Sequence, residues 1–261
     1  MRPDEAADES RRSLNNHLLL TWAGPLSIII TLIGWAGFAR FLPPPSPELD
    51  PAQVVSLWSD HTDLIVVGMI FCMWGGTFYA IFAVSVFSML RRIEPGRPLL
   101  SYAQLVMGMF TIAFLCWNFM WLGAVGYIAP SSPQMLKGLA DIGFLMTFAP
   151  IPPFSMQCAF VALVVLRDWS DNPLLPRWVG YLNLWVAIFF LPAQCALLVT
   201  SGPLAYDGLL TFWVPVAVFT AWFFVMCATM RKGFRASFAE HDSLDETQPN
   251  SPSSPIEEKV R

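Results

Sequence analysis

Residues that could do acid–base or metal chemistry stand together at one place in the chain, around His61. Asp60 precedes this histidine directly, and Asp63 follows two residues later. A histidine beside carboxylates can bind a metal or act as a general base. One histidine with two aspartates makes only a weak metal site, and a solvated helix end explains the same residues. We therefore expect no metal here, with Asp60, His61 and Asp63 as a weak alternative site.

Other catalytic patterns are missing from the sequence. The only histidines are His17, His61 and His241, all outside the apolar segments, so a pair of histidines cannot ligate a haem there. The sequence contains no HExxH, Walker A or GxGxxG motif. No ionisable residue lies in the middle of an apolar segment, where membrane enzymes and ion-coupled transporters usually need one. These absences favour a protein without catalytic residues or cofactors.

Composition narrows the class of protein further. Of the 261 residues, 55% are hydrophobic and 13% are charged, whereas soluble proteins carry about 25% charged residues. The five cysteines fall inside apolar segments without a CxxC pair, which favours small buried side chains over disulfides or a thiolate metal site. No basic patch with interleaved aromatic residues occurs, which excludes nucleic acid as a partner. The composition predicts a polytopic membrane protein whose first partner is the lipid bilayer.

Six apolar segments are long enough to cross a hydrocarbon core of about 30 Å. They cover residues 18–37, 64–90, 99–129, 142–166, 179–200 and 209–230. Most connections are short, so consecutive spans should be antiparallel neighbours. The sequence thus predicts an all-α integral membrane protein, a six-transmembrane-helix bundle. Residues 17–232 form its membrane domain, 1–16 a polar N-terminal tail, and 233–261 a disordered C-terminal tail.

The basic residues predict the orientation of this bundle. Ten of them fall on one side of the spans: Arg11, Arg12, Arg91, Arg92, Arg97, Arg167, Arg177, Arg231, Lys232 and Arg235. Only Arg40 and Lys137 fall on the other. Because basic loops stay in the cytoplasm, both tails are expected to be cytoplasmic.

The longest predicted outer loop contains a short helix. After a proline-rich run, Asp50-Pro51 reads as an N-cap followed by a proline in the first helical position. Val54, Val55 and Trp58 then recur at helical spacing. We expect residues 51–61 to form an amphipathic helix on the outer surface.

Two predicted hairpins share a short pattern. Leu90-Arg91 is followed by Pro98-Leu99-Leu100, and Leu166-Arg167 is followed by Pro173-Leu174-Leu175. One interpretation is a tandem repeat of helical hairpins, as in some transporters. The other is that similar hydropathy alone produces the match.

Amides and prolines converge at one depth of the predicted bundle. Pro150, Pro152 and Pro153 must kink or break the fourth span, and amides in hydrocarbon need partners. We expect a cavity open to the outer face, capped by the 51–61 helix, for an apolar molecule with one or two hydrogen-bonding groups. Its candidate residues are Trp117, Asn118, Trp121, Pro150, Pro152, Pro153, Gln157 and Gln194. The alternative is that the amides pair between helices and the prolines only shape the bundle.

Two stretches carry a resemblance to known proteins. Asn172 to Tyr181, and Thr200 to Gly208 followed by Thr211-Phe212-Trp213, resemble families of uncharacterised bacterial six-span membrane proteins. The proline-rich first outer loop before a short helix is similar too. The likeness covers most of residues 18–232 in layout but only these stretches in sequence. It implies the topology and a bacterial inner (plasma) membrane, and it implies no activity.

Three functions follow from these observations. The first is a non-catalytic accessory or scaffold subunit of a membrane assembly, packing against a membrane protein partner or a second copy of the chain. The second is a carrier or binder of an apolar small molecule or lipid. The third is an enzyme with interfacial catalytic groups at His61. The missing ionisable groups favour the first, and the broken fourth span favours the second.

Overall fold

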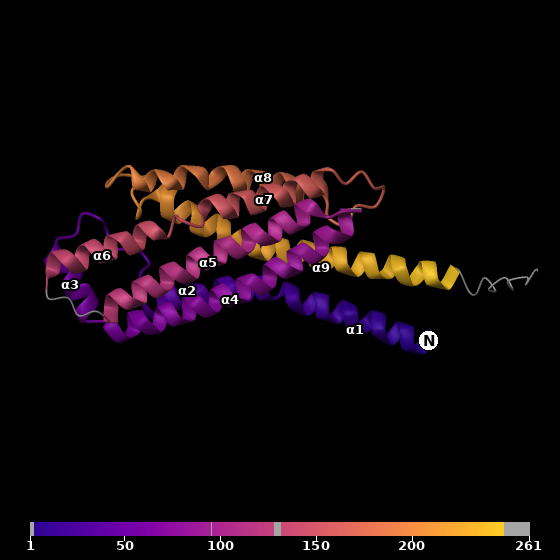
Figure 1. Ribbon diagram of the computed structural model, residues 1–261, viewed down its shortest axis with the longest axis horizontal. Coiled ribbons are helices and arrows are strands. Elements are labelled where there is room, and N and C mark those ends of the chain that lie inside the picture. The colour runs from indigo at the N-terminus through magenta and orange to yellow at the C-terminus, as the bar shows by residue number, and fades with distance from the viewer. Residues whose placement is uncertain (1–2, 95, 128–131, 248–261) are drawn as a thin grey trace, which may run out of the picture.

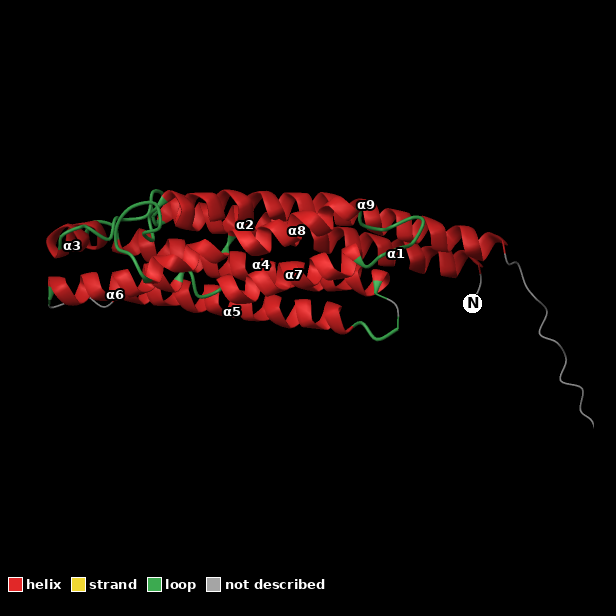
Figure 2. Cartoon of the chain, turned by 90° about the horizontal axis from the view of Figure 1, so that it is seen from above, coloured by secondary structure: helices red, strands yellow, loops and turns green. Residues whose placement is uncertain are grey.

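The computed structural model describes residues 3–94, 96–127 and 132–247, and every regular element in these ranges is a helix (Figures 1 and 2). The elements in chain order are α1 (Pro3–Thr21), α2 (Ala23–Leu32), the π-helix η1 (Ile33–Phe38), α3 (Pro51–Ser59), α4 (Thr62–Ile93), α5 (Leu99–Tyr127), α6 (Pro133–Met146), α7 (Ile151–Leu166), α8 (Arg177–Phe189), the 3-10 helix η2 (Leu191–Leu197), the π-helix η3 (Leu209–Trp213) and α9 (Val214–Thr247).

Six helical segments are apolar and long enough to cross a membrane. They are Asp8–Phe38, Thr62–Ile93, Leu99–Val125, Pro133–Leu166, Arg177–Leu197 and Leu209–Ala239. Large apolar side chains cover their outward faces, as a surface in contact with lipid requires. The predicted all-α six-helix bundle is therefore confirmed, and the chain is an integral multi-pass membrane protein.

The two ends of the bundle differ. At one end, here called the α3 end, α3 packs against α6; at the other, the termini end, α1 and α9 project beyond the remaining helices (Figure 1). The His17 ring lies 4.8 Å from the Phe234 ring, and Arg231 donates a hydrogen bond to the carbonyl of Leu18 at 2.6 Å. These contacts join α1 to α9 near the end of the sixth span.

The C-terminal boundary differs from the sequence expectation. Residues 233–247 were expected to be disordered but continue α9 to Thr247. Polar side chains do not prevent a helix from continuing, because the backbone hydrogen bonds of a helix are internal. Contacts of Arg231 and Phe234 with α1 also stabilise this part of α9. The rest of the predicted tail, 248–261, lies outside the described residues. Likewise, most of the polar N-terminal segment 1–16 belongs to α1.

Glycines allow α2, η1 and α4 to approach closely. A Cβ on Gly34 would collide with the Gly68 carbonyl, and a Cβ on Gly75 would collide with Thr31. Small residues serve this purpose in membrane bundles, where packing rather than the hydrophobic effect holds helices together. Helix α4 thereby sits at the centre of the bundle, next to α2, α5, α7 and α9.

The fourth span is broken at its prolines. Helix α6 ends at Met146, residues 147–150 form a turn, and α7 begins at Ile151. Pro152 and Pro153 fall in the first turn of α7, where backbone N–H groups lack intrahelical acceptors and proline removes nothing. The predicted break in this span is present, and it exposes the turn to the bundle interior.

Candidate functional site

A first cavity of about 120 Å³ lies beside the break in the fourth span. Pro150 and Thr147 of the turn line it, with side chains from α5, α7, η3 and α9 and with Phe190 between α8 and η2. Five phenylalanines supply much of the wall: Phe148, Phe154, Phe190, Phe212 and Phe219. The fold therefore places an apolar, aromatic cavity inside the membrane-spanning part of the bundle.

A second cavity of about 120 Å³ adjoins the first. The two share the lining residues Leu115, Thr147, Phe212, Val216 and Phe219. The second extends between α2, α4, α5 and α9 and reaches Trp35 and Tyr79. For comparison, an engineered cavity of about 150 Å³ in a soluble protein holds a benzene molecule. The paired cavities are thus large enough for a ring or a short section of an alkyl chain.

Hydroxyl groups are the main polar feature of the first cavity. No charged side chain is present among the described residues that line it. Thr147 Oγ1 accepts a hydrogen bond from Asn118 Nδ2 at 3.0 Å, and Thr111 Oγ1 donates to the Met107 carbonyl at 2.9 Å. Thr211 is 1% exposed, and its hydroxyl has no hydrogen-bond partner among the described residues. One buried donor therefore remains unused at the cavity wall.

A seam of mostly small or polar residues, with two leucines, runs along the inward face of α5. Its members recur at alternating spacings of three and four: Ser101, Gln104, Gly108, Thr111, Leu115, Asn118 and Leu122. This is the spacing of a helix face that packs along its whole length against a neighbouring helix. The seam faces α4 and α7, since a Cβ at Gly108 would touch both Ala83 and the Gln157 amide.

A polar pair on α4 and α7 lies next to this seam. Tyr79, which lines the second cavity, donates a hydrogen bond from its hydroxyl to Gln157 Oε1. In the described part of the chain, Gln157 Nε2 and both amide atoms of Gln104 are buried without a partner. The Tyr79–Gln157 pair links α4 to α7 through the low-dielectric interior, where such a bond is strong and an unpaired group costly.

An aromatic plug closes the α3 side of the cavities. It consists of Trp35, Phe41, Trp58, Phe144 and Tyr206, with neighbouring ring centroids 5.1–6.2 Å apart. Trp35 also stacks on Phe212 of the cavity wall at 6.5 Å. Helix α3 contributes Trp58 to the plug, and none of its residues is among the described residues that line either cavity.

A polar network fastens this plug. Tyr206 donates to Asp141 at 3.2 Å, while Lys137 bonds Asp141 and the Pro47 carbonyl, both at 2.9 Å. Burial, and then the adjacent Asp141 carboxylate, raise the pKa of the Tyr206 phenol, so it remains a donor at neutral pH. The first loop, α6 and the loop after η2 are thereby tied together.

The structure brings some of the sequence-derived candidates to the cavities. Pro150 lines the first cavity directly, and Asn118 supports Thr147 by its hydrogen bond. Trp121 lines neither cavity; its Nε1 donates to the Leu139 carbonyl at 3.0 Å and so joins α5 to α6. Gln157 acts one step away, through Tyr79.

Other candidates lie elsewhere. Trp117 is 65% exposed on the outward face of α5, although its neighbour Asn118 is fully buried. Pro152 is exposed and Pro153 half-buried, and neither lines a cavity. Gln194 is half-buried in η2, away from both cavity walls.

The His61 segment contains no metal-binding cluster. Asp60 is the C-cap of α3, Asp63 lies in the first turn of α4, and both residues are exposed. His61 Nε2 lies 3.4 Å from Arg40 Nη1, a cation that would oppose a metal ion. Among the described residues no group of three or more His, Cys, Asp or Glu could hold a metal.

Sequence reasoning missed Tyr79, Gln104, Thr111, Thr147 and Thr211. A signal for two of them was present, because Gln104 and Thr111 repeat at the spacing of the α5 seam. No comparable signal in the sequence marks Thr147 or Thr211, which lie in the turn at 147–150 and in the π-helix η3.

Comparisons of the chain with protein-family models, curated proteins and solved structures found no match.

Proposed function

We propose that this protein binds an apolar small molecule or lipid inside the membrane, in the paired cavities beside the broken fourth span. The observation that carries this proposal is the aromatic, uncharged wall of the first cavity around the Pro150 turn. Ligand sites of this kind are mostly apolar, with a few placed polar groups. Here those groups are hydroxyls on threonines.

The absence of charge at the cavity argues for a neutral ligand. An ionised group taken into this wall would lose its hydration without gaining a counter-ion. The same argument favours a binder or carrier that works without ion coupling, because no described lining residue can take up or release a proton near neutral pH.

We further propose that the termini end faces the cytoplasm of a bacterial inner membrane. The ten basic residues counted above all lie near that end of the helices, and Arg40 and Lys137 lie near the α3 end. This distribution follows the positive-inside rule. In this orientation the cavities occupy the outer part of the bundle.

The accessory-subunit function, which was the first expectation from the sequence, is here the alternative proposal. The outward face of α5 would be its docking surface, since Trp117, Met120 and Phe110 are all exposed there. Lipid alone would cover the same face equally well, so the cavity is the more specific observation. The interfacial-enzyme function has the least support of the three, because the Arg40 guanidinium lies 3.4 Å from His61 Nε2.

Native mass spectrometry of protein extracted gently from its own membrane tests the main proposal. We expect the wild-type chain to retain a neutral small molecule. Val216→Phe fills space at a residue shared by both cavities and should remove it. The matched control is Val84→Phe, which adds the same volume at an exposed position of α4.

A bare wild-type chain, or a molecule retained equally by both variants, would contradict the proposal. A protein co-purifying at fixed stoichiometry with a chain free of small molecules would favour the accessory-subunit alternative.

A further inference from the structure

The Thr211 hydroxyl specifies the chemistry of the ligand more closely than the shape of the cavity does. This inference rests on the proposed binding function. Thr211 lines the first cavity from η3, is 1% exposed, and has no hydrogen-bond acceptor among the described residues. A buried hydroxyl without a partner costs free energy comparable to a lost hydrogen bond. Native proteins rarely leave such groups unpaired.

The other two hydroxyls of this cavity differ from Thr211. Thr111 has donated its proton to the Met107 carbonyl. Thr147 is paired with Asn118, whose Nδ2 donates to its oxygen, and Asn118 Oδ1 of the same amide is buried without a partner in the described part of the chain. Thr211 is therefore the one hydroxyl among the described residues of the first cavity that has no partner.

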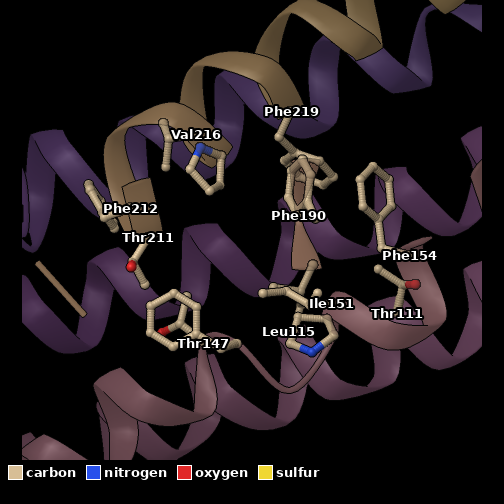
Figure 3. A pocket seen from close by; sticks show the side chains of 13 residues that line it. Thr111, Leu115, Thr147, Ile151, Phe154, Phe190, Thr211, Phe212, Val216 and Phe219 are labelled. Atoms are coloured by element: carbon tan, nitrogen blue, oxygen red, sulfur yellow. The ribbon is translucent and has the colours of Figure 1, made fainter. Parts of the chain in front are cut away.

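These groups lie at different ends of the cavity. Figure 3 shows Thr147 and Thr211 near Phe212, whereas Thr111 lies near Phe154, beside the group formed by Phe190 and Phe219. A ligand that satisfies the Thr211 hydroxyl needs an acceptor at the Thr147–Thr211 end. Its apolar body would lie among the phenylalanines at the other end, which favour offset or edge-to-face contact with a flat ring.

We propose that the cavity takes a neutral molecule that presents a carbonyl oxygen to Thr211 and a flat or aliphatic body to Phe154, Phe190 and Phe219. A carbonyl oxygen is an acceptor with two lone pairs, so it can accept from the Thr211 hydroxyl. A carboxylate is excluded from this class because the described wall offers no cation to balance its charge.

Two probes that differ only in carbonyl groups test this inference. Decyl-1,4-benzoquinone carries the acceptors and decylbenzene does not. Affinities for both are measured by native mass spectrometry titration of the full chain in detergent. Thr211→Val, which keeps the shape and removes the hydroxyl, should weaken quinone binding roughly 3- to 10-fold. It should leave decylbenzene binding unchanged, which also shows that the variant is folded.

Two further variants serve as controls. Thr77→Val removes a hydroxyl that donates to the Met73 carbonyl on an exposed part of α4 and lines neither cavity, so quinone affinity should be unchanged. Thr211→Ser keeps the donor and should retain wild-type affinity for the quinone.

The outcomes separate the two proposals. If both probes bind and Thr211→Val changes neither affinity, or weakens both equally, the carbonyl inference is overturned while the binding function stands. If neither probe binds the wild-type chain saturably, both proposals are overturned.

Discussion

Buried amides of this bundle fall into two groups at the scale of single residues. Asn183 is fully satisfied: its Oδ1 accepts from Trp222 at 2.9 Å, and its Nδ2 donates to the Val179 carbonyl at 2.8 Å. Gln157 is partly satisfied, through Tyr79, whereas both amide atoms of Gln104 are unpaired within the described structure. Satisfied amides join helices, and unsatisfied ones cost free energy.

This difference predicts that replacing each glutamine by methionine changes the free energy of unfolding differently. Gln157→Met removes the acceptor of the Tyr79 hydroxyl, which should lower the free energy of unfolding by about 1–3 kcal/mol. Gln104→Met, the matched control on the adjacent helix, removes no hydrogen bond of the described residues and should be neutral or stabilising. Denaturant or SDS unfolding in mixed micelles measures both. Equal losses in the two variants would contradict the assignment.

At the scale of elements, the turn at residues 147–150 is the feature that makes the site. Helix α6 stops at Met146 and α7 starts at Ile151, and Thr147 and Pro150 of the turn between them line the first cavity. The break also allows α6 to extend toward α3 (Figure 2). The break at the three prolines thus determines where the first cavity lies and where α6 places Phe144 of the aromatic plug.

Restoring a continuous fourth helix should close the cavity. In Pro150→Ala/Pro152→Ala/Pro153→Ala the backbone donors return and the steric block is gone, so the turn should convert to helix and binding of the co-purified molecule should fall. Spin labels at exposed positions 142 and 163 report the change as a new distance between α6 and α7 by double electron–electron resonance. Pro152→Ala alone affects an exposed first-turn position and should leave both distance and binding unaltered; a triple variant with wild-type spectra would refute the role of the break.

At the scale of the whole molecule, α1 and α9 form a paired extension at the termini end. Arg92 stacks over the Phe238 ring at 4.6 Å and donates to Ser237 at 2.9 Å, which ties α4 to the same extension. The opposite end is closed by the aromatic plug and its Lys137–Asp141 ion pair. The molecule is therefore polar and basic at one end and aromatic and mixed in charge at the other.

This polarity predicts which positions are reachable from outside the cell. In a background without reactive native cysteines, Glu48→Cys in the first loop should react with a membrane-impermeant maleimide on intact cells. Arg235→Cys on α9 should react only after permeabilisation. Both positions are exposed, so accessibility to the reagent is controlled by the membrane alone. The reverse labelling pattern would invert the proposed orientation.

The sequence by itself determined the number and place of the spans, the short helix after Pro51 and the break at the prolines. Each depends on local properties: length of an apolar run, a capping box at Asp50 and Gln53, and missing backbone donors. Only the tertiary structure decided which residues face inward. Trp117 faces out and Asn118 in, and Thr211 reaches the cavity from a helix distant in sequence. The physical reason is that lipid is as apolar as the bundle interior, so apolar side chains cover both faces of a span and hydropathy does not distinguish them.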